Sequence, residues 1–112
     1  DAVYVGQRSA NYAHPILVFD RDGALLTSFG GGEIGRQGYD FGNHGLVVQP
    51  ATSAMKEEAV WVMDFFNHGV YSYNLDGALT GRAGGHNVSS CDSDKFDAVA
   101  DAAFRKGSAY FA

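Results

Sequence analysis

The stretch HPILVFDRDGAL at residues 14–25 is matched by HGVYSYNLDGAL at residues 68–79, 54 residues later. The histidine, the Asp-Gly-Ala turn and the final leucine coincide, and a Gly-Gly pair follows each copy at the same distance. A spacing of about 40 to 55 residues between units of short strands is typical of β-propeller blades. The repeat therefore predicts that residues 1–112 are part of a propeller.

The repeat divides the chain into copies at about residues 3–31 and 41–85, with an incomplete third copy from Phe96. Apolar and aromatic runs predict antiparallel strands throughout, and we expect an all-β fold. The Asp22-Gly23 and Asp76-Gly77 pairs predict tight hairpin turns, with both residues of each pair at positive φ.

Three further segments have a predicted role. Residues 30–38 contain five glycines and are predicted to connect neighbouring blades. Residues 49–59, which include Pro50 and several charges, are predicted to form an exposed loop, and residues 105–108 its shorter counterpart.

Strand-like segments stand at both ends of the chain, at residues 2–5 and 109–112. We therefore expect a fragment of about two blades rather than a complete functional domain, because cut strands leave unpaired edges. Such a fragment would expose apolar strands such as residues 16–19. The alternative is a small domain in which the first and last strands pair with each other.

Composition restricts the classes of function. The net charge is -5, which argues against a nucleic-acid partner, since such proteins need a basic face. No apolar run is long enough to predict a membrane span. Cys91 is the one cysteine, so it is either a free thiol or half of a disulfide with a partner outside these residues.

Short motifs in both copies resemble the NHL-repeat family. The segment DFFNHGV at residues 64–70 resembles the Asn-His-Leu signature that follows a "V-x-D" strand. NHGLVV at residues 43–48 looks like the inner strand of the same blade, and FGG at residues 29–31 resembles the blade ending. The resemblance covers nearly the whole chain and implies an antiparallel, six-bladed β-propeller.

Within that family the chain is most similar to peptidyl-α-hydroxyglycine α-amidating lyase and its bacterial relatives. The likeness lies in VYVGQR at residues 3–8, in NHGL at 43–46, and in FDAVADAA at 96–103. Val99-Ala100 stand where the family has Pro-Thr, and the family's cysteine after the Phe is absent. The family holds zinc through three histidines in a central channel, and calcium lies deeper.

Residue by residue, the resemblance implies that Arg8 is the catalytic-site arginine and His44 the first zinc ligand. It implies that the backbone carbonyl of Leu46 binds calcium. Taken alone, the residues favour interpreting His44 as a channel or core histidine without metal, and Arg8 is equally consistent with an exposed surface arginine. His14 and His68 recur at one place in the two copies, which predicts a repeated packing role.

Two functions of different classes follow. The first is an enzyme, a lyase that cleaves the N–Cα bond of a peptidyl-α-hydroxyglycine to give a peptide amide and glyoxylate. It would use zinc, act on a small-molecule or peptide substrate, and be secreted or belong to the secretory pathway. The alternative is a non-catalytic NHL propeller that binds protein or ligand partners on its loop face.

Overall fold

In the computed structural model the segments predicted as strands form antiparallel β-sheets. The structure describes residues 1–9, 11–38, 40–52, 55–84, 90, 95–105 and 108–112, and within these ranges it contains no helix. Cys91 and most of the Gly-rich segment after β9, including His86, lie outside the described residues. No helix in the described part of the chain is long and apolar enough to cross a membrane.

The first repeat copy forms a three-stranded sheet in the order β1-β2-β3. Its strands are β1 (Val3–Gly6), β2 (Ile16–Phe19) and β3 (Leu25–Phe29). A short hairpin of β4 (Arg36–Gln37) and β5 (Asp40–Phe41) follows, within and just after the segment predicted as a connection.

The second copy forms a four-stranded meander in the order β6-β7-β8-β9. Its strands are β6 (Asn43–Gln49), β7 (Ala59–Asp64), β8 (Gly69–Tyr73) and β9 (Leu79–Gly84). The C-terminal segment forms a hairpin of β10 (Ala102–Arg105) and β11 (Ser108–Phe111). Strand β10 thus starts six residues after Phe96, where a third copy was expected to begin.

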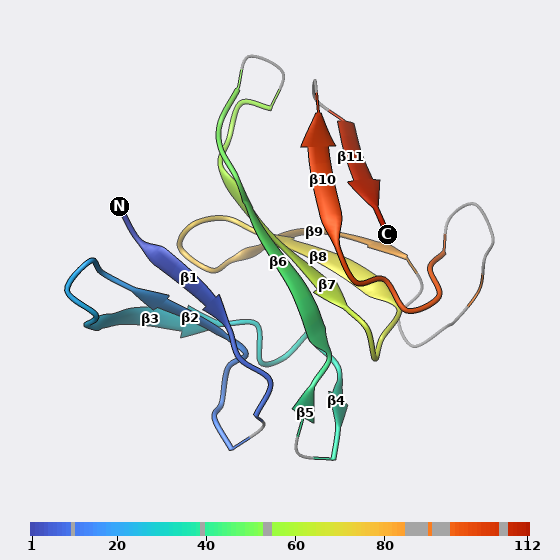
Figure 1. Ribbon diagram of the computed structural model, residues 1–112, viewed down its shortest axis with the longest axis horizontal. Helices are drawn as coiled ribbons and strands as arrows, with labels where there is room; N and C mark the ends of the chain where they lie inside the picture. The colour runs from blue at the N-terminus through green and yellow to red at the C-terminus, as the bar shows by residue number, and fades with distance from the viewer. Residues whose placement is uncertain (10, 39, 53–54, 85–89, 91–94, 106–107) are drawn as a thin grey trace.

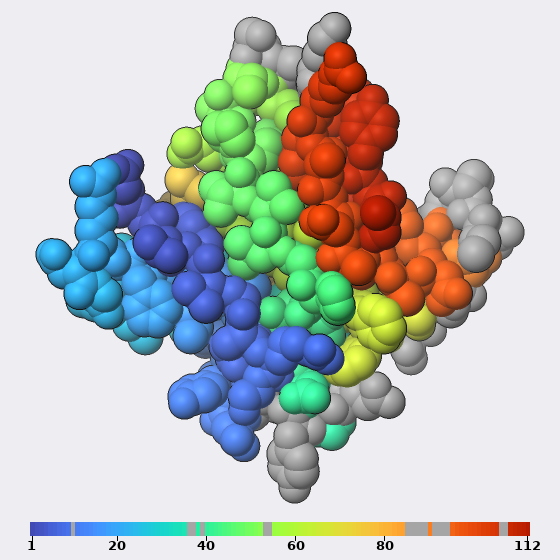
Figure 2. All heavy atoms as spheres, in the orientation of Figure 1, coloured from blue at the N-terminus to red at the C-terminus, as the bar shows by residue number. Residues whose placement is uncertain are grey.

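The four-stranded sheet lies between the three-stranded sheet and the β10–β11 hairpin. One of its faces packs against the first sheet in a cluster that includes Ile16, Val18, Phe29, Val62 and Tyr73. Its other face, at Met63 and Val70, packs against the C-terminal segment through Val99, Phe96 and Phe111. All five residues of β8 are buried as a result. Strand β6 lies beside both β1 and β10 (Figures 1 and 2).

This packing corrects one expectation about apolar exposure. Ile16 is fully buried and Val18 is 3% exposed, so the prediction that residues 16–19 form an exposed strand was wrong for these two side chains. The exposed apolar face of the first sheet is its other face, where Val3 pairs with Phe19 and Val5 with Leu17. Val3 is 52% exposed and Val5 is 38% exposed.

The two predicted hairpin turns are present and have the same geometry. In the first, Asp20 Oδ1 accepts the backbone N–H groups of Asp22 and Ala24. In the second, Asn74 Oδ1 accepts those of Asp76 and Ala78.

Only the glycine of each turn has positive φ, +84° at Gly23 and +86° at Gly77. The expectation that the aspartates share this conformation was wrong. An Asx side chain that bonds to the backbone two residues on lets the turn form with a single left-handed residue.

Candidate functional site

The turn between β7 and β8 is organised by the carboxylate of Asp64. Asp64 is fully buried, and its Oδ1 accepts the backbone N–H groups of Phe66 at 3.0 Å and Asn67 at 3.1 Å. Its Oδ2 accepts the N–H of Gly35 at 2.6 Å, from the connection between the two sheets. A carboxylate that accepts three backbone N–H groups holds both segments in one geometry.

Two glycines bring the chain close to this carboxylate. A Cβ on Gly42 would overlap Asp64 Oδ1, and a Cβ on Gly35 would lie 2.5 Å from Asn67 Oδ1. The backbone of Gly42 also accepts the N–H of Phe65 at 2.7 Å. These contacts fix the backbone on both sides of the turn. They therefore constrain where the rings of Phe65 and Phe66 can lie.

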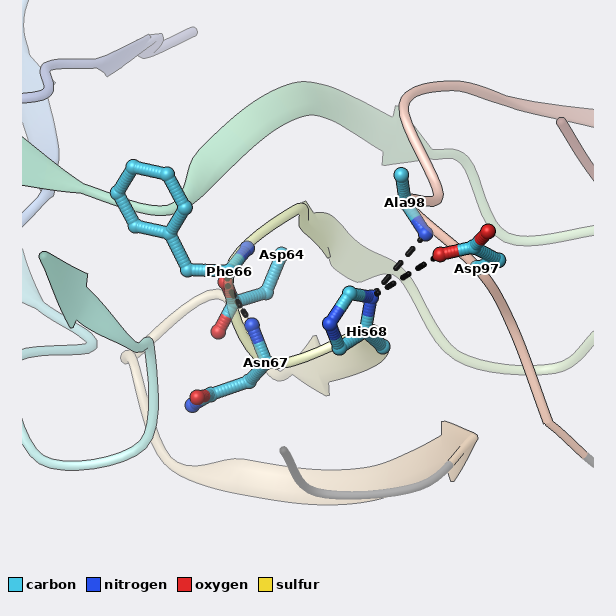
Figure 3. Close-up of polar contacts among 6 residues, drawn as sticks. All are labelled: Asp64, Phe66, Asn67, His68, Asp97 and Ala98. Atoms are coloured by element: carbon cyan, nitrogen blue, oxygen red, sulfur yellow. Dashed lines mark hydrogen bonds and ion pairs between the residues drawn. The ribbon is translucent and has the colours of Figure 1, made fainter. Parts of the chain in front are cut away.

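Side chains on this turn project to opposite sides. Figure 3 shows Phe66 pointing away from the segment that carries Asp97 and Ala98, while His68 points toward it. His68 Nδ1 accepts the backbone N–H of Ala98 at 3.2 Å and lies 3.8 Å from Asp97 Oδ1. His68 and Ala98 both have positive φ, 54° and 56°, a conformation that is uncommon outside glycine.

His14, the counterpart of His68, makes a different contact, since its Nδ1 lies 2.8 Å from Ser28 Oγ within its own sheet. Both histidines bond to neighbouring structure, but the partners differ. These hydrogen bonds therefore do not support the prediction that His14 and His68 have the same packing role.

Arg8 lies two residues after β1 and is held against the start of the second copy. Its Nε donates to the carbonyl of Phe41 at 3.2 Å, and its own carbonyl accepts the N–H of Phe41 at 2.5 Å. The guanidinium carbon lies 5.6 Å from the centroid of the Phe66 ring, within the range of a cation–π contact. The side chain is exposed.

His44, the second residue of β6, lies on the same aromatic pair. Its ring centroid is 6.0 Å from that of Phe65, and the rings of Phe65 and Phe66 are 6.0 Å apart in an edge-to-face arrangement. The structure thus brings Arg8 and His44 to one end of the sheets, joined by Phe65 and Phe66. We call these four residues the aromatic-bridge cluster.

The sequence analysis did not identify Phe65 and Phe66 as members of this cluster. The motif D-F-F-N contains both rings, and an Asx turn at Asp64 is visible in it. Phe65 is 40% exposed, whereas its neighbour Asp64 is fully buried. The contacts of Phe66 with Arg8 span 58 residues of sequence, so no local pattern could have indicated them.

The described residues do not form a zinc site by themselves. They contain no group of three or more His, Cys, Asp or Glu side chains that could hold a metal ion. His44 offers one imidazole, and an open catalytic zinc site needs three protein ligands. Leu46 is half-buried on β6, an edge strand of its sheet, where half of the backbone groups lack strand partners.

Comparisons of the chain with protein-family models, with curated proteins and with solved structures found no match. The NHL resemblance therefore depends on the residues quoted above alone.

Proposed function

We propose that the chain forms about two blades of a six-bladed NHL-type β-propeller, a fragment of a larger ring. The two hairpins with matching turns, β2–β3 and β8–β9, support this assignment. In each, the strand register shifts at the corresponding place, between Val18 and Phe19 and between Ser72 and Tyr73. Equivalent irregularities 54 residues apart are expected of two copies of one supersecondary unit.

Burial gives a second line of support. The four-stranded sheet has neighbours on both faces, whereas the first sheet presents an apolar face that is 52% exposed at Val3 and 57% exposed at Leu25. In a propeller each blade buries the faces of its neighbours. A preceding blade would cover this face, as the first sheet covers the second.

We further propose that the propeller is a lyase that resembles peptidyl-α-hydroxyglycine α-amidating lyase. The single observation that carries this proposal is the aromatic-bridge cluster, which holds Arg8 and His44 on neighbouring rings at one end of the sheets. These are the two residues in this chain whose side chains the resemblance assigns to the active site.

Arg8 suits the binding of a substrate carboxylate. Its Nε donates to the Phe41 carbonyl and its guanidinium lies over the Phe66 ring, so a ligand would bind through the two η nitrogens. A guanidinium binds a carboxylate through two parallel N–H donors. Arg8 would hold the carboxylate of the hydroxyglycine and stabilise developing charge.

In the reaction the substrate hydroxyl loses its proton and the carbon–oxygen double bond forms as the N–Cα bond breaks. The nitrogen keeps the bonding electron pair and takes a proton, so the products are a peptide amide and glyoxylate. His44 contributes an imidazole beside this centre. Zinc would require two further ligands from outside the described residues, and calcium at Leu46 remains a prediction.

The experiment is metal analysis and lyase assay of the full-length protein. In His44→Ala we expect loss of zinc, because a two-ligand site binds the metal far more weakly. In Arg8→Ala we expect zinc to be retained and turnover to fall on the order of a hundredfold or more. His14→Ala is the matched control, since that imidazole bonds to Ser28 and lies outside the cluster.

Unchanged zinc in His44→Ala, or unchanged turnover in Arg8→Ala, would favour the second candidate. That candidate is a non-catalytic NHL propeller that binds a protein or small-molecule partner.

A further inference from the structure

We infer that His68 is a proton-sensitive latch between the second sheet and the C-terminal segment. The neutral imidazole holds that segment at Ala98, and protonation of the ring releases it. This His68 latch goes beyond the proposed function, since it requires neither a metal nor a substrate.

The hydrogen bond between His68 and Ala98 fixes the protonation state of the ring. Figure 3 shows the imidazole directed from the β7–β8 turn toward the C-terminal segment, where its Nδ1 accepts the Ala98 N–H at 3.2 Å. A neutral imidazole has one acceptor nitrogen, whereas both nitrogens are donors in the charged form. A proton on Nδ1 would therefore place two donors against each other and break the bond.

Asp97 is the acceptor to which the charged imidazole would turn. Its Oδ1 lies 3.8 Å from the same Nδ1, and its side chain is 56% exposed. An ion pair in contact with solvent contributes little, whereas a half-buried N–H such as that of Ala98 costs more when it loses its acceptor. Protonation should therefore weaken the attachment of the segment even though it strengthens the ion pair.

Other charged side chains also lie on the elements that pack against His68, namely Asp64, Arg82, Lys95 and Asp101. Asp64 bonds to three backbone N–H groups. Arg82 lies opposite Tyr71 in the β8–β9 register, and Tyr71 packs toward the first sheet. Among the described residues, Asp97 is the one carboxylate within ion-pair distance of the imidazole, so it is the charge that opposes release.

The backbone is in the left-handed region at both ends of the hydrogen bond. The φ angle is 54° at His68 and 56° at Ala98. Residues other than glycine are strained in this region and remain there only where surrounding contacts hold them. Loss of the bond between His68 and Ala98 would remove one of these contacts from both residues at once, which favours a change of conformation at this point.

The segment that the latch holds lies against the strand that carries His44. Val99, next to Ala98, is 2% exposed and packs on the second sheet. A Cβ on Gly45 would overlap the carbonyl oxygen of Ala100, so the segment and β6 approach closely beside His44. Release at Ala98 should therefore loosen the packing of the segment on this part of β6.

The test is amide hydrogen exchange of the protein, expressed as protection relative to an unstructured peptide at the same pH. Histidine ordinarily changes its charge between about pH 5 and pH 8. We expect the protection of the Ala98 amide to be retained at the upper end of this range. It should fall about tenfold at the lower end, which is the effect of losing one hydrogen bond.

His68→Asn is the decisive variant. The asparagine Oδ1 can accept the Ala98 N–H, tolerates no change of charge in this pH range, and belongs to a residue that adopts positive φ more readily than most. Protection should therefore be retained at both ends of the range. His68→Ala, which lacks the acceptor, should show low protection at both.

Two further variants complete the design. Asp97→Asn removes the ion pair, so the loss of protection in acid should become larger than in the wild type. His14→Asn is the matched control, because the His14 imidazole bonds to Ser28 within the first sheet, and it should leave the wild-type response unchanged.

An acid-induced loss of protection in His68→Asn equal to that of the wild type would overturn the inference, because another group would then cause it. Wild-type protection that does not change with pH, or a smaller loss in Asp97→Asn, would overturn it as well. Nitrogen-15 shifts of the His68 ring provide a direct check, since Nδ1 must be unprotonated wherever Ala98 is protected.

Discussion

Asp64 Oδ2 accepts the backbone N–H of Gly35 at 2.6 Å, so a fully buried carboxylate on β7 ties the second sheet to the connection that precedes it. The same side chain also bonds two N–H groups of its own turn. Asp64 therefore couples the position of its own turn to that of the connection at Gly35, 29 residues earlier.

Asp64→Asn should destabilise the protein. The amide has one acceptor oxygen, so its NH₂ group must face an N–H donor that the carboxylate formerly bonded. A buried donor left unpaired costs about 1–3 kcal/mol. Urea unfolding of the protein measures this loss, and Asp22→Asn, on an exposed turn, is the control. Equal midpoints for Asp64→Asn and wild type would contradict the prediction.

The two equivalent turn glycines offer a matched comparison. Gly23→Ala and Gly77→Ala both place a side chain at positive φ, which costs about 1–2 kcal/mol. A Cβ at Gly23 meets nothing within 4 Å, whereas one at Gly77 lies 2.6 Å from Phe29 Cδ1 and 2.9 Å from Phe29 Cβ. Phe29 is buried and packs on Tyr73, with the ring centroids 5.1 Å apart, so it cannot move aside freely.

We therefore expect Gly77→Ala to be the more destabilising by about a further 1–3 kcal/mol, the usual cost of overpacking. Denaturant midpoints of the two variants measured side by side test this expectation. A Gly23→Ala variant that is as destabilised as Gly77→Ala would mean that turn strain alone determines the loss.

Expressed alone, the 112-residue chain should unfold with poor cooperativity or aggregate. The exposed face of the first sheet contains Val3, Val5 and Leu25, which are 38–57% exposed, and open strand edges invite pairing between chains. Calorimetry and light scattering would test this behaviour. A sharp two-state transition from a soluble monomer would show that the chain needs no neighbouring blade.

Alkaline pH should unfold the protein through Tyr73. Burial, together with the nearby Glu33 carboxylate whose Oε2 accepts the phenol hydrogen bond at 3.3 Å, raises the pKa of Tyr73 above its usual 10.0. The unfolded chain then ionises first, so stability is retained below about pH 10 and falls as the pH rises further.

Tyr73→Phe should weaken this alkaline loss of stability. The variant should also lack the hydrogen bond to Glu33 at neutral pH. The pKa of Tyr71 is also raised, chiefly by burial, so part of the alkaline loss should remain in the variant. Tyr110→Phe, at an exposed position, is the control and should follow the wild-type profile. Identical pH profiles for Tyr73→Phe and wild type would show that ionisation of another group causes the alkaline loss of stability.

Several features of the fold could be predicted from short stretches of sequence. The turns at Gly23 and Gly77 were placed correctly, because an Asx residue and a glycine three positions later specify a turn through bonds that span four residues. The antiparallel pairing of the strands on either side follows from the same turns, since a hairpin loop sets the register of its strands.

Features that depend on distant segments could not be predicted in this way. The sequence shows a carboxylate at Asp64 and a guanidinium at Arg8, but their partners are distant in sequence: Gly35 lies in the connection before β4, and Phe66 lies in the turn between β7 and β8. The burial of Ile16 could not be predicted either, because both faces of β2 are apolar in sequence. Only the packing of one sheet on another determines which face is covered. Short-range bonds specify turns, whereas burial and side-chain contacts between sheets follow from how the sheets stack.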